Sequence, residues 1–247
     1  MTEQQPFAGR VALVTGASGG LGRAIAAALA AEDVTLALHY GASADAAHEL
    51  ALRIAADGGR ASVFGADLRH ADAPAQLADR VAEQLGPIEL LINNAGLGRR
   101  LTWEQTTIDE FDDAYAVNLR APFLLTQREL PSMVQGGIGR VLFISSVAGL
   151  TGGIVGAHYA SAKSGLHGLT HFLASQLADS GVTVNALAPA LIAQTGMLPG
   201  DPEELAARIP VGRLGTPDEV ADLALAVLRN GYVTNQVISI DGGIYPG

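Results

Sequence analysis

Short apolar runs alternate with longer amphipathic stretches along the whole chain, at spacings typical of strands and helices. Runs of four to six residues rich in Val, Leu and Ile predict buried strands, whereas alanine-rich stretches with apolar residues three and four apart predict helices. The expected strands are 10–15, 34–39, 61–65, 88–92, 140–145, 183–187 and 237–240. The expected helices are 22–31, 44–56, 73–85, 108–133 and 157–180, the fourth broken late by Pro131.

This regular alternation predicts an α/β fold with a parallel sheet, because parallel neighbours are joined by crossover helices that cover both faces of the sheet. No linker, repeat or low-complexity segment divides the 247 residues. We therefore expect one doubly wound, seven-stranded domain over residues 1–247.

Composition narrows the class of protein further. Hydrophobic residues make up 49% of the chain and charged residues 16%, so a large core is expected and disorder is not. The absence of cysteine excludes disulfides and thiolate chemistry. The amino-terminal residues do not resemble a signal peptide, and no uninterrupted apolar stretch predicts a membrane span. A net charge of −10 argues against nucleic acid or an anionic membrane as partner. We expect a soluble, cytoplasmic protein.

One basic residue differs from all the others. The chain has fifteen lysines and arginines, of which Lys163 alone is a lysine. A general preference for arginine explains the other fourteen but not this exception. Lysine carries a compact ammonium on a flexible stem, which a planar guanidinium cannot replace. Lys163 is therefore a candidate for a specific chemical role.

A glycine-rich segment, TGASGGLG at residues 15–22, follows the first strand and opens the first helix. Gly16 permits a tight turn, Gly20 lets the backbone approach a pyrophosphate, and Gly22 allows close packing of helix and strand. The helix N-terminus offers unpaired N–H groups to the phosphates. In this position the segment predicts a dinucleotide-binding loop.

Ser146, Tyr159 and Lys163 form a second group of candidates. Tyr159 and Lys163 are four residues apart in a predicted helix and share one face, and Ser146 follows the fifth strand, where open α/β sheets bind ligands. An ammonium about 4 Å from a phenol, at an effective dielectric of about 20, supplies about 4 kcal/mol towards the phenolate. That energy would lower the tyrosine pKa by roughly 2–3 units, which helps proton exchange near neutral pH. Ser146 would hold a substrate oxygen beside a hydride donor.

Together these motifs resemble the short-chain dehydrogenase/reductase family, close to its 3-oxoacyl-acyl-carrier-protein reductase branch. The similarity runs nearly end to end. The matching motifs are the glycine loop at 15–22, Asp67 after the third strand, Asn93-Asn94-Ala95-Gly96, Asn118, Ser146 thirteen residues before the tyrosine, Tyr159-x-x-x-Lys163, Pro189 after the sixth strand and Asp241-Gly242-Gly243.

The resemblance implies a Rossmann fold whose residues 8–96 bind NAD(P)(H) and whose residues 97–247 carry catalysis and substrate, with a lid near 190–210. It implies that Tyr159 is the acid/base, Lys163 tunes it and holds the nicotinamide ribose, Ser146 orients the carbonyl, and Asn118 holds a water that links Lys163 to solvent. The expected cofactor contacts are Gly16, Ser18, Gly20, Leu21, Gly22, His39, Tyr40, Ser43, Asp67, Leu68, Asn94, Ala95, Gly96, Tyr159, Lys163, Pro189 and Ile192.

The end of the second strand favours NADP(H) over NAD(H). NAD-specific relatives carry an acidic residue there, about 20 residues past the glycine loop, to hold the ribose hydroxyls. His39-Tyr40-Gly41 has no carboxylate to repel a 2′-phosphate. The arginine or lysine that often holds this phosphate is replaced by Gly19, which leaves His39 and the Ser43 hydroxyl as candidate ligands. No metal is expected.

Two departures from the family pattern affect the substrate side. Ala190 replaces the usual glycine after Pro189, which stiffens the entry to the lid. The threonine expected near the cofactor carboxamide falls at Gln194, with Thr195 one residue later. Within the lid, Met197 and Leu198 are expected to cover the site.

Two pairs of residues and one tryptophan are weaker candidates. His167 and His171, four apart on one helix, would suit a metal pair, but no third ligand follows at motif spacing, which favours surface or interface histidines. Arg99-Arg100 would suit an anionic substrate or a solvated loop. Trp103 would line the pocket or anchor its loop.

These features favour an oxidoreductase that interconverts a ketone and a secondary alcohol, as a carbonyl reductase of small ketones or β-keto esters. Two alternatives stay open: a 3-oxoacyl-acyl-carrier-protein reductase, and a non-catalytic dinucleotide-sensing protein, which would have no reason to keep Ser146, Tyr159 and Lys163 together.

The charge pattern and the helix faces predict partners. An acidic carrier protein needs a basic docking patch, but the matching positions, Gly137 and Ser180, are neutral. The carrier protein is disfavoured, although Arg128, Arg140 or Arg99-Arg100 could substitute. Apolar residues on more than one face of helices 108–133 and 157–180 favour a homotetramer, with residues 241–247 in a second interface.

Overall fold

The computed structural model describes residues 6–196, 198 and 200–245. Seven strands form one parallel sheet in the order β3-β2-β1-β4-β5-β6-β7. Because the order reverses between β1 and β4, the predicted doubly wound sheet is confirmed. The strands are β1 (Val11–Val14), β2 (Thr35–Tyr40), β3 (Arg60–Gly65), β4 (Ile88–Asn93), β5 (Gly139–Ile144), β6 (Val182–Pro189) and β7 (Val237–Ile240).

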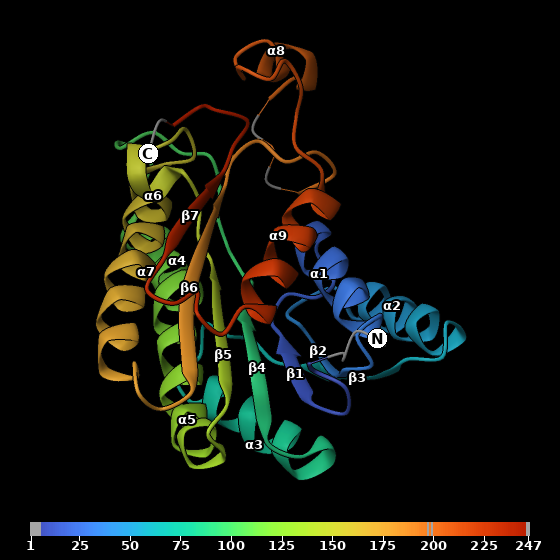
Figure 1. Ribbon diagram of the computed structural model, residues 1–247. Helices are drawn as coiled ribbons and strands as arrows, with labels where there is room; N and C mark the ends of the chain where they lie inside the picture. The colour runs from blue at the N-terminus through green and yellow to red at the C-terminus, as the bar shows by residue number, and fades with distance from the viewer. Residues whose placement is uncertain (1–5, 197, 199, 246–247) are drawn as a thin grey trace.

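Helices cover both faces of this sheet (Figure 1). The described helices are α1 (Gly20–Ala30), α2 (Ala44–Ala56), α3 (Ala73–Leu85), α4 (Ile108–Tyr115), the π-helical turn η1 (Ala116–Arg120), α5 (Ala121–Gly136), α6 (Ala148–Thr151), α7 (Ala157–Gln176), α8 (Pro202–Ala206) and α9 (Pro217–Arg229). One buried apolar cluster joins the sheet to α1, α2 and α9, and another joins it to α3, α5 and α7. No helix among the described residues is long and apolar enough to cross a membrane.

The expectation that Pro131 breaks the long helix is wrong. α5 continues through Pro131 and ends at Gly136, where Gly137 adopts a left-handed conformation with φ of 67°. Pro131 is exposed, so the carbonyl that loses its N–H partner lies on the open side of the helix. The regular helix is interrupted earlier, at η1, where the backbone takes π-helical spacing around Asn118.

Two other helices differ from their expected bounds, and α6, α8 and α9 were not expected. α7 ends at Gln176, not at residue 180, because residues 177–180 form a turn that leads to Gly181 at φ of 80°. α1 begins two residues earlier than expected, at Gly20. α9 starts with a capping box in which Thr216 and Glu219 bond each other's backbone N–H.

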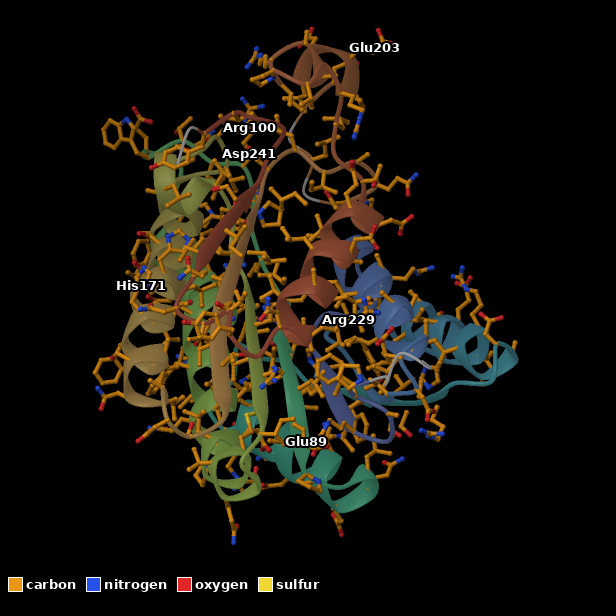
Figure 2. All side chains as sticks on the ribbon, in the orientation of Figure 1. Glu89, Arg100, His171, Glu203, Arg229 and Asp241 are labelled. Atoms are coloured by element: carbon orange, nitrogen blue, oxygen red, sulfur yellow. The ribbon has the colours of Figure 1, made fainter. Side chains whose placement is uncertain are left out.

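α9 lies on the same side of the sheet as α1, the helix that follows the glycine loop, because the two helices pack together. Arg229, at the end of α9 (Figure 2), forms an ion pair with Glu32, just after α1, and this pair joins the two helices. The order of the sheet and this packing leave the carboxyl ends of the strands open, below the segment that carries α8 (Figure 1).

Candidate active site

A cleft of about 940 Å³ lies along the carboxyl ends of the strands. It extends from the glycine loop to Pro189 and the segment that follows. Of the predicted catalytic and cofactor residues, all line this cleft except three: Tyr40, Ser43 and Asn118. The cleft therefore brings together residues that are far apart in the sequence, as the open edge of a doubly wound sheet allows.

The glycine loop is packed so tightly that its glycines have no space for a side chain. A Cβ on Gly22 would lie 2.4 Å from the Gly16 carbonyl oxygen, and one on Gly20 would lie 2.6 Å from the Gln194 carbonyl oxygen. Gly16 itself has φ of 64°. A Cβ on Gly19, in contrast, would meet only the Gly16 carbonyl oxygen at 3.5 Å. Position 19 is thus the one of these four without a steric need for glycine.

Residues of the Asn-Asn-Ala-Gly motif hold this loop in place. Thr15 Oγ1 accepts the backbone N–H groups of Asn94 and Ala95, both at 2.9 Å. Asn94 Nδ2 donates to the carbonyl oxygens of Thr15 at 2.8 Å and Gly16 at 3.1 Å. Asn94 therefore fixes the loop by its side chain while it also lines the cleft.

The start of α1 fits a pyrophosphate. Its N-cap, Gly19, makes no side-chain cap, and its first turn carries no acidic residue. The first N–H groups of this eleven-residue helix thus meet neither a capping oxygen nor a repelling carboxylate. The tight glycine loop leads the backbone directly to this point.

His39 links the glycine loop to the segment after β3 through two hydrogen bonds. Its Nδ1 accepts the N–H of Gly16 at 3.1 Å, so the ring carries its hydrogen on Nε2, which donates to the Ala66 carbonyl oxygen at 3.0 Å. Burial lowers the His39 pKa to about 4, and the side chain is neutral near pH 7. Both ring nitrogens are thus engaged by the backbone, which does not favour His39 as a ligand for a 2′-phosphate.

Tyr40 and Ser43 lie outside the cleft lining. The Tyr40 ring packs against Gly65, where an added Cβ would be 2.7 Å from its hydroxyl oxygen. Ser43 is the N-cap residue of α2. Successive side chains along a strand point to opposite faces of the sheet, and so His39 and Tyr40 cannot both face the loop.

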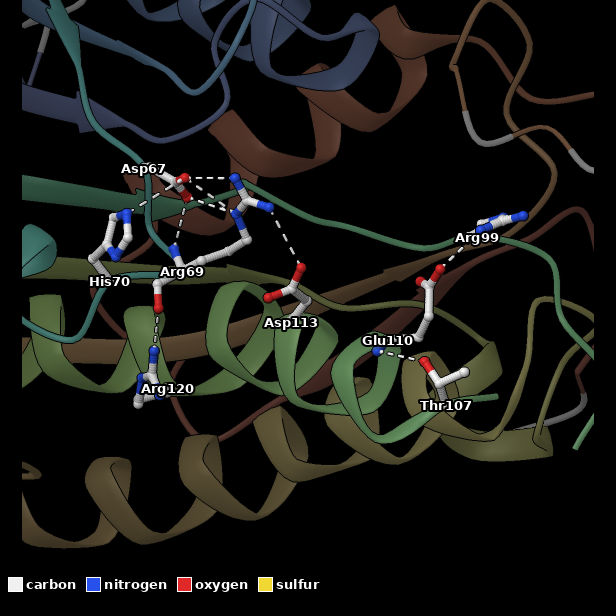
Figure 3. Close-up of polar contacts among 8 residues, drawn as sticks. All are labelled: Asp67, Arg69, His70, Arg99, Thr107, Glu110, Asp113 and Arg120. Atoms are coloured by element: carbon white, nitrogen blue, oxygen red, sulfur yellow. Dashed lines mark hydrogen bonds and ion pairs between the residues drawn. The ribbon is translucent and has the colours of Figure 1, made fainter. Parts of the chain in front are cut away.

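A charged network that the sequence did not indicate borders the cleft at Asp67 (Figure 3). Arg69 lines the cleft, and its guanidinium bonds Asp67 at 2.6 Å and Asp113 of α4 at 3.4 Å. Arg120 of η1 donates to the Arg69 carbonyl oxygen at 2.5 Å. Hydrogen bonds from Arg69 lower the Asp67 pKa to about 2. In the sequence, the short separation of Arg69 from Asp67, two residues, could have indicated this ion pair.

At the other end of the cleft, Tyr159 and Lys163 are buried on α7. Lys163 Nζ lies 5.7 Å from the centroid of the Tyr159 ring and donates to the Ile144 carbonyl oxygen at 2.7 Å. Burial lowers the Lys163 pKa to about 8. Ser146 Oγ accepts the Ala148 N–H at 3.1 Å, which leaves its own hydrogen available to donate.

The direction of the Tyr159 pKa differs from the expectation. Burial raises this pKa, and a hydrogen bond with Ser146 opposes the rise only in part. The Lys163 ammonium is directed at the Ile144 carbonyl oxygen and does not offset the effect of burial on this pKa. A buried phenol loses the hydration that its anion would need.

Asn118 lies behind the cleft and supports its wall. Its Oδ1 accepts the N–H of Leu97 at 3.0 Å, and its Nδ2 donates to the Leu97 carbonyl oxygen at 2.6 Å. The next residue, Gly98, packs on the Tyr159 ring, since an added Cβ would lie 2.8 Å from Tyr159 Cδ2. Asn118 thus fixes the segment against which the tyrosine rests, a contact that its position in the sequence did not reveal.

The end of the cleft that holds the predicted catalytic residues Ser146, Tyr159 and Lys163, hereafter the catalytic end, is otherwise apolar. Among the described lining residues of this part, none is charged: they are Leu97, Thr151, Gly153, Ile154, Val155, Ala190, Leu191, Ile192, Thr195, Gly196, Leu198 and Ile244. Ile154 and Val155 were not predicted, although their position just before α7 places them beside Tyr159.

Two of the weaker candidates, Trp103 and Arg99, lie outside the cleft lining. Trp103 is 79% exposed and does not line the cleft. Arg99 forms an ion pair with Glu110 at 2.9 Å (Figure 3). Thr195, not Gln194, lines the cleft, and its hydroxyl donates to the Ile192 carbonyl oxygen at 2.9 Å. Met197 lies outside the described residues.

The doubly wound sheet, the glycine loop at its open edge and the Ser-Tyr-Lys group in the same cleft are features of a dinucleotide-binding α/β protein. Comparison with known proteins gives the family. Residues 10–205 match the family described as short chain dehydrogenase. The chain belongs to this family of oxidoreductases, whose members use NAD(P)(H).

Similar proteins include reductases of acyl thioesters. The chain is 36% identical over 238 residues to a 3-oxoacyl-[acyl-carrier-protein] reductase of Synechocystis sp., which covers 95% of this chain and 96% of that protein. It is 36% identical over 243 residues to an acetoacetyl-CoA reductase of Allochromatium vinosum, with 96% and 98% covered. A mutant short-chain dehydrogenase/reductase of Serratia marcescens superposes with a TM-score of 0.89 at 34% identity, over 97% of this chain and 99% of that one.

Proposed function

We propose that the chain reduces a small, uncharged ketone or β-keto ester to a secondary alcohol. The observation that carries this proposal is the catalytic end of the cleft, where Ser146, Tyr159 and Lys163 meet an apolar wall without a charged side chain. A substrate carboxylate or phosphate would have no cationic partner there apart from Lys163, which is directed at Ile144.

In this mechanism the bound cofactor supplies the hydride. Ser146 Oγ donates a hydrogen bond to the carbonyl oxygen and holds it beside the Tyr159 hydroxyl. Tyr159 donates its proton to this oxygen as negative charge develops there. The Lys163 ammonium lies 5.7 Å from the centroid of the Tyr159 ring and attracts the negative charge once the phenolate has formed. Asn118 supports the segment at residues 97–98 on which the Tyr159 ring packs. Since burial raises the pKa of Tyr159, the resting group is the protonated phenol that reduction requires.

A panel of ketones, β-keto esters and aldehydes, each with NADPH and with NADH, tests this proposal through nicotinamide absorbance. We expect turnover of apolar ketones and β-keto esters and much slower turnover of α-keto acids. Failure of the wild-type protein on every substrate, with cofactor binding intact, would instead favour a dinucleotide sensor.

An acyl thioester is the second candidate substrate because two of the similar proteins are named for such reductions. The charge distribution supports a free thioester better than a carrier-bound one. Arg128 pairs with Asp79, Arg99 pairs with Glu110, and Arg140 donates to three backbone carbonyls. Competition between a carrier-bound 3-oxoacyl chain and its small thioester analogue should show no preference above about tenfold for the carrier form.

For the cofactor we propose a preference for NADP(H). No carboxylate stands at the end of β2, and Gly41 and Ala42 line the cleft there without a charge. The Arg69 guanidinium lines the same end of the cleft, although Asp67 and Asp113 share its charge. Dissociation constants for NADPH and NADH, measured by fluorescence titration, test the preference, which tighter NADH binding would contradict.

We also propose a homotetramer. Phe123, Val134 and Phe172 are exposed on neighbouring faces of α5 and α7. With Leu130, Pro131 and Leu173 they surround an apolar groove of about 480 Å³. A second copy of the chain would remove this surface from water. Light scattering should give a tetramer for the wild type and a smaller species for Phe172→Glu.

A further inference from the structure

His167 and His171 stand on successive turns of α7, and the structure gives them separate partners. His167 Nε2 lies 2.7 Å from Ser145 Oγ in the interior. His171 is exposed (Figure 2), and its Nδ1 lies 2.7 Å from Asn235 Oδ1. In the part of the chain that the structure describes, no three His, Cys, Asp or Glu side chains are grouped as metal ligands. The two histidines are not a metal pair, and the buried one needs another explanation.

The hydrogen bonds around Ser145 fix the form of the His167 ring. Ser145 Oγ lies 3.0 Å from the Lys163 carbonyl oxygen as well as 2.7 Å from His167 Nε2. A carbonyl only accepts and a hydroxyl has one hydrogen, so Ser145 donates to Lys163 and the imidazole N–H donates to Ser145. Burial and the nearby His171 and Lys163 lower the His167 pKa, which keeps this ring neutral.

The His167 ring also fills the space between α6 and α7. A Cβ on Gly149 of α6 would lie 2.9 Å from His167 Cε1 and 2.9 Å from the Lys163 carbonyl carbon. The backbone N–H of Ser145 donates to Leu187 of β6 at 2.7 Å, so this residue is also tied to the sheet. The ring therefore meets the segment after β5 from one side and the turn of α7 that carries Lys163 from the other.

We propose that His167 is a positioning residue for the hydride-transfer site. By donating to Ser145 it directs the serine hydroxyl to the Lys163 carbonyl, and this chain of two hydrogen bonds sets the distance between Ser146 on the sheet edge and the Tyr159–Lys163 face of α7. His167 touches neither substrate nor cofactor, since it is absent from the cleft lining. The proposal rests on the roles proposed above for Ser146, Tyr159 and Lys163.

Two variants at position 167 separate the hydrogen bond from the volume of the ring. His167→Leu fills much of the same space without a donor, whereas His167→Gln keeps an amide N–H that can reach Ser145. We expect His167→Leu to lower kcat by about tenfold, with KM for the ketone and the cofactor Kd changed by less than about twofold. His167→Gln should restore kcat to within about threefold of wild type. His171→Leu, one turn further along α7, is the matched control and should keep wild-type kcat.

Ser145→Ala tests the same link from its other end and does not depend on how well position 167 tolerates leucine. It should lower kcat about as much as His167→Leu, and the double variant should be no slower than either single variant, because both changes break one chain of bonds. Additive losses, a Gln variant as slow as the Leu variant, or wild-type kcat in Ser145→Ala and His167→Leu would overturn the proposal. A loss of cofactor affinity in proportion to kcat would overturn it as well, since it would indicate general loosening. Failure of the proposed function would look different: the wild type would turn over no ketone, or Tyr159→Phe would remain active.

Discussion

The two ends of the cleft are built by different means. At the cofactor end the backbone itself forms the surface, and Gly16, Gly20 and Gly22 lie where any Cβ would strike a neighbouring backbone atom. At the catalytic end the surface includes buried polar side chains: Lys163 donates to the Ile144 carbonyl oxygen, and Tyr159 is hydrogen-bonded to Ser146.

This difference has consequences for mutation. At the cofactor end the fit of the backbone is decisive, so substitutions there should change cofactor binding and protein stability together. At the catalytic end the placement of proton donors is decisive, so substitutions there should change kcat while cofactor affinity stays nearly constant.

The largest effect is expected from Tyr159→Phe, at the catalytic end. The ring still packs on Gly98, but the proton donor is lost, so kcat should fall by about a thousandfold while cofactor Kd stays within about twofold. Lys163→Arg should not rescue the reaction step, because a planar guanidinium does not fit between the Ile144 carbonyl and the Tyr159 ring. Steady-state kinetics with a parallel cofactor titration measures both. Substantial turnover in either variant would contradict the mechanism.

Next in size is a pH effect from outside the cleft, in α5, which buries Glu129. Burial raises the Glu129 pKa from 4.5 to about 7, so the folded protein binds more protons than the unfolded chain between these values. Stability should therefore fall as pH rises through this window.

Glu129→Gln removes the titration and should gain up to about 3 kcal/mol relative to wild type between pH 4.5 and pH 8, as measured by urea unfolding. Glu83→Gln, on the exposed side of α3, is the control and should not show this gain. If the unfolding free energies of wild type and Glu129→Gln differ by the same amount at pH 4.5 and at pH 8, the raised pKa of Glu129 is contradicted.

A smaller effect is expected at the cofactor end from Gly22→Ala. The new methyl group would lie 2.4 Å from the Gly16 carbonyl oxygen, and the resulting shift should cost about 2 kcal/mol of stability and weaken cofactor binding. Gly19→Ala, with 3.5 Å of space, should change neither quantity. Thermal melts and cofactor titrations compare the two. Equal behaviour of the two alanine variants would mean that the loop is not sterically constrained.

The smallest effect is a gain of affinity at the same loop. Gly19→Arg uses the open space at this position to supply the cation that the chain lacks there, and should tighten NADPH binding by about tenfold, or 1.4 kcal/mol, without tightening NADH binding. The gain should weaken as salt is raised. Equal tightening of both cofactors would show that the arginine meets the shared pyrophosphate and not the 2′-phosphate.

Features that depend on neighbouring residues were predictable from the sequence, whereas features that depend on contacts between distant residues were not. The strands and the Tyr159–Lys163 face were predictable because periods of two and about 3.6 residues are local properties. The capping box formed by Thr216 and Glu219 is an equally local signal for the start of α9. The continuation of α5 through Pro131 was not predictable, because it depends on the exposure of one turn after packing.

By itself, the sequence determined the order of elements, the glycine loop after the first strand and the separation of Tyr159 from Lys163. Only the tertiary structure decided what the polar side chains bond to. Asn118 supports Leu97, His39 clamps Gly16, and His167 reaches Ser145, across 21, 23 and 22 positions of sequence. Such partners are chosen when the strands align in the sheet and the helices dock, and no local pattern of the chain encodes them. Desolvation is likewise a property of the whole fold, and it raised the Tyr159 pKa where spacing alone had predicted a lower one.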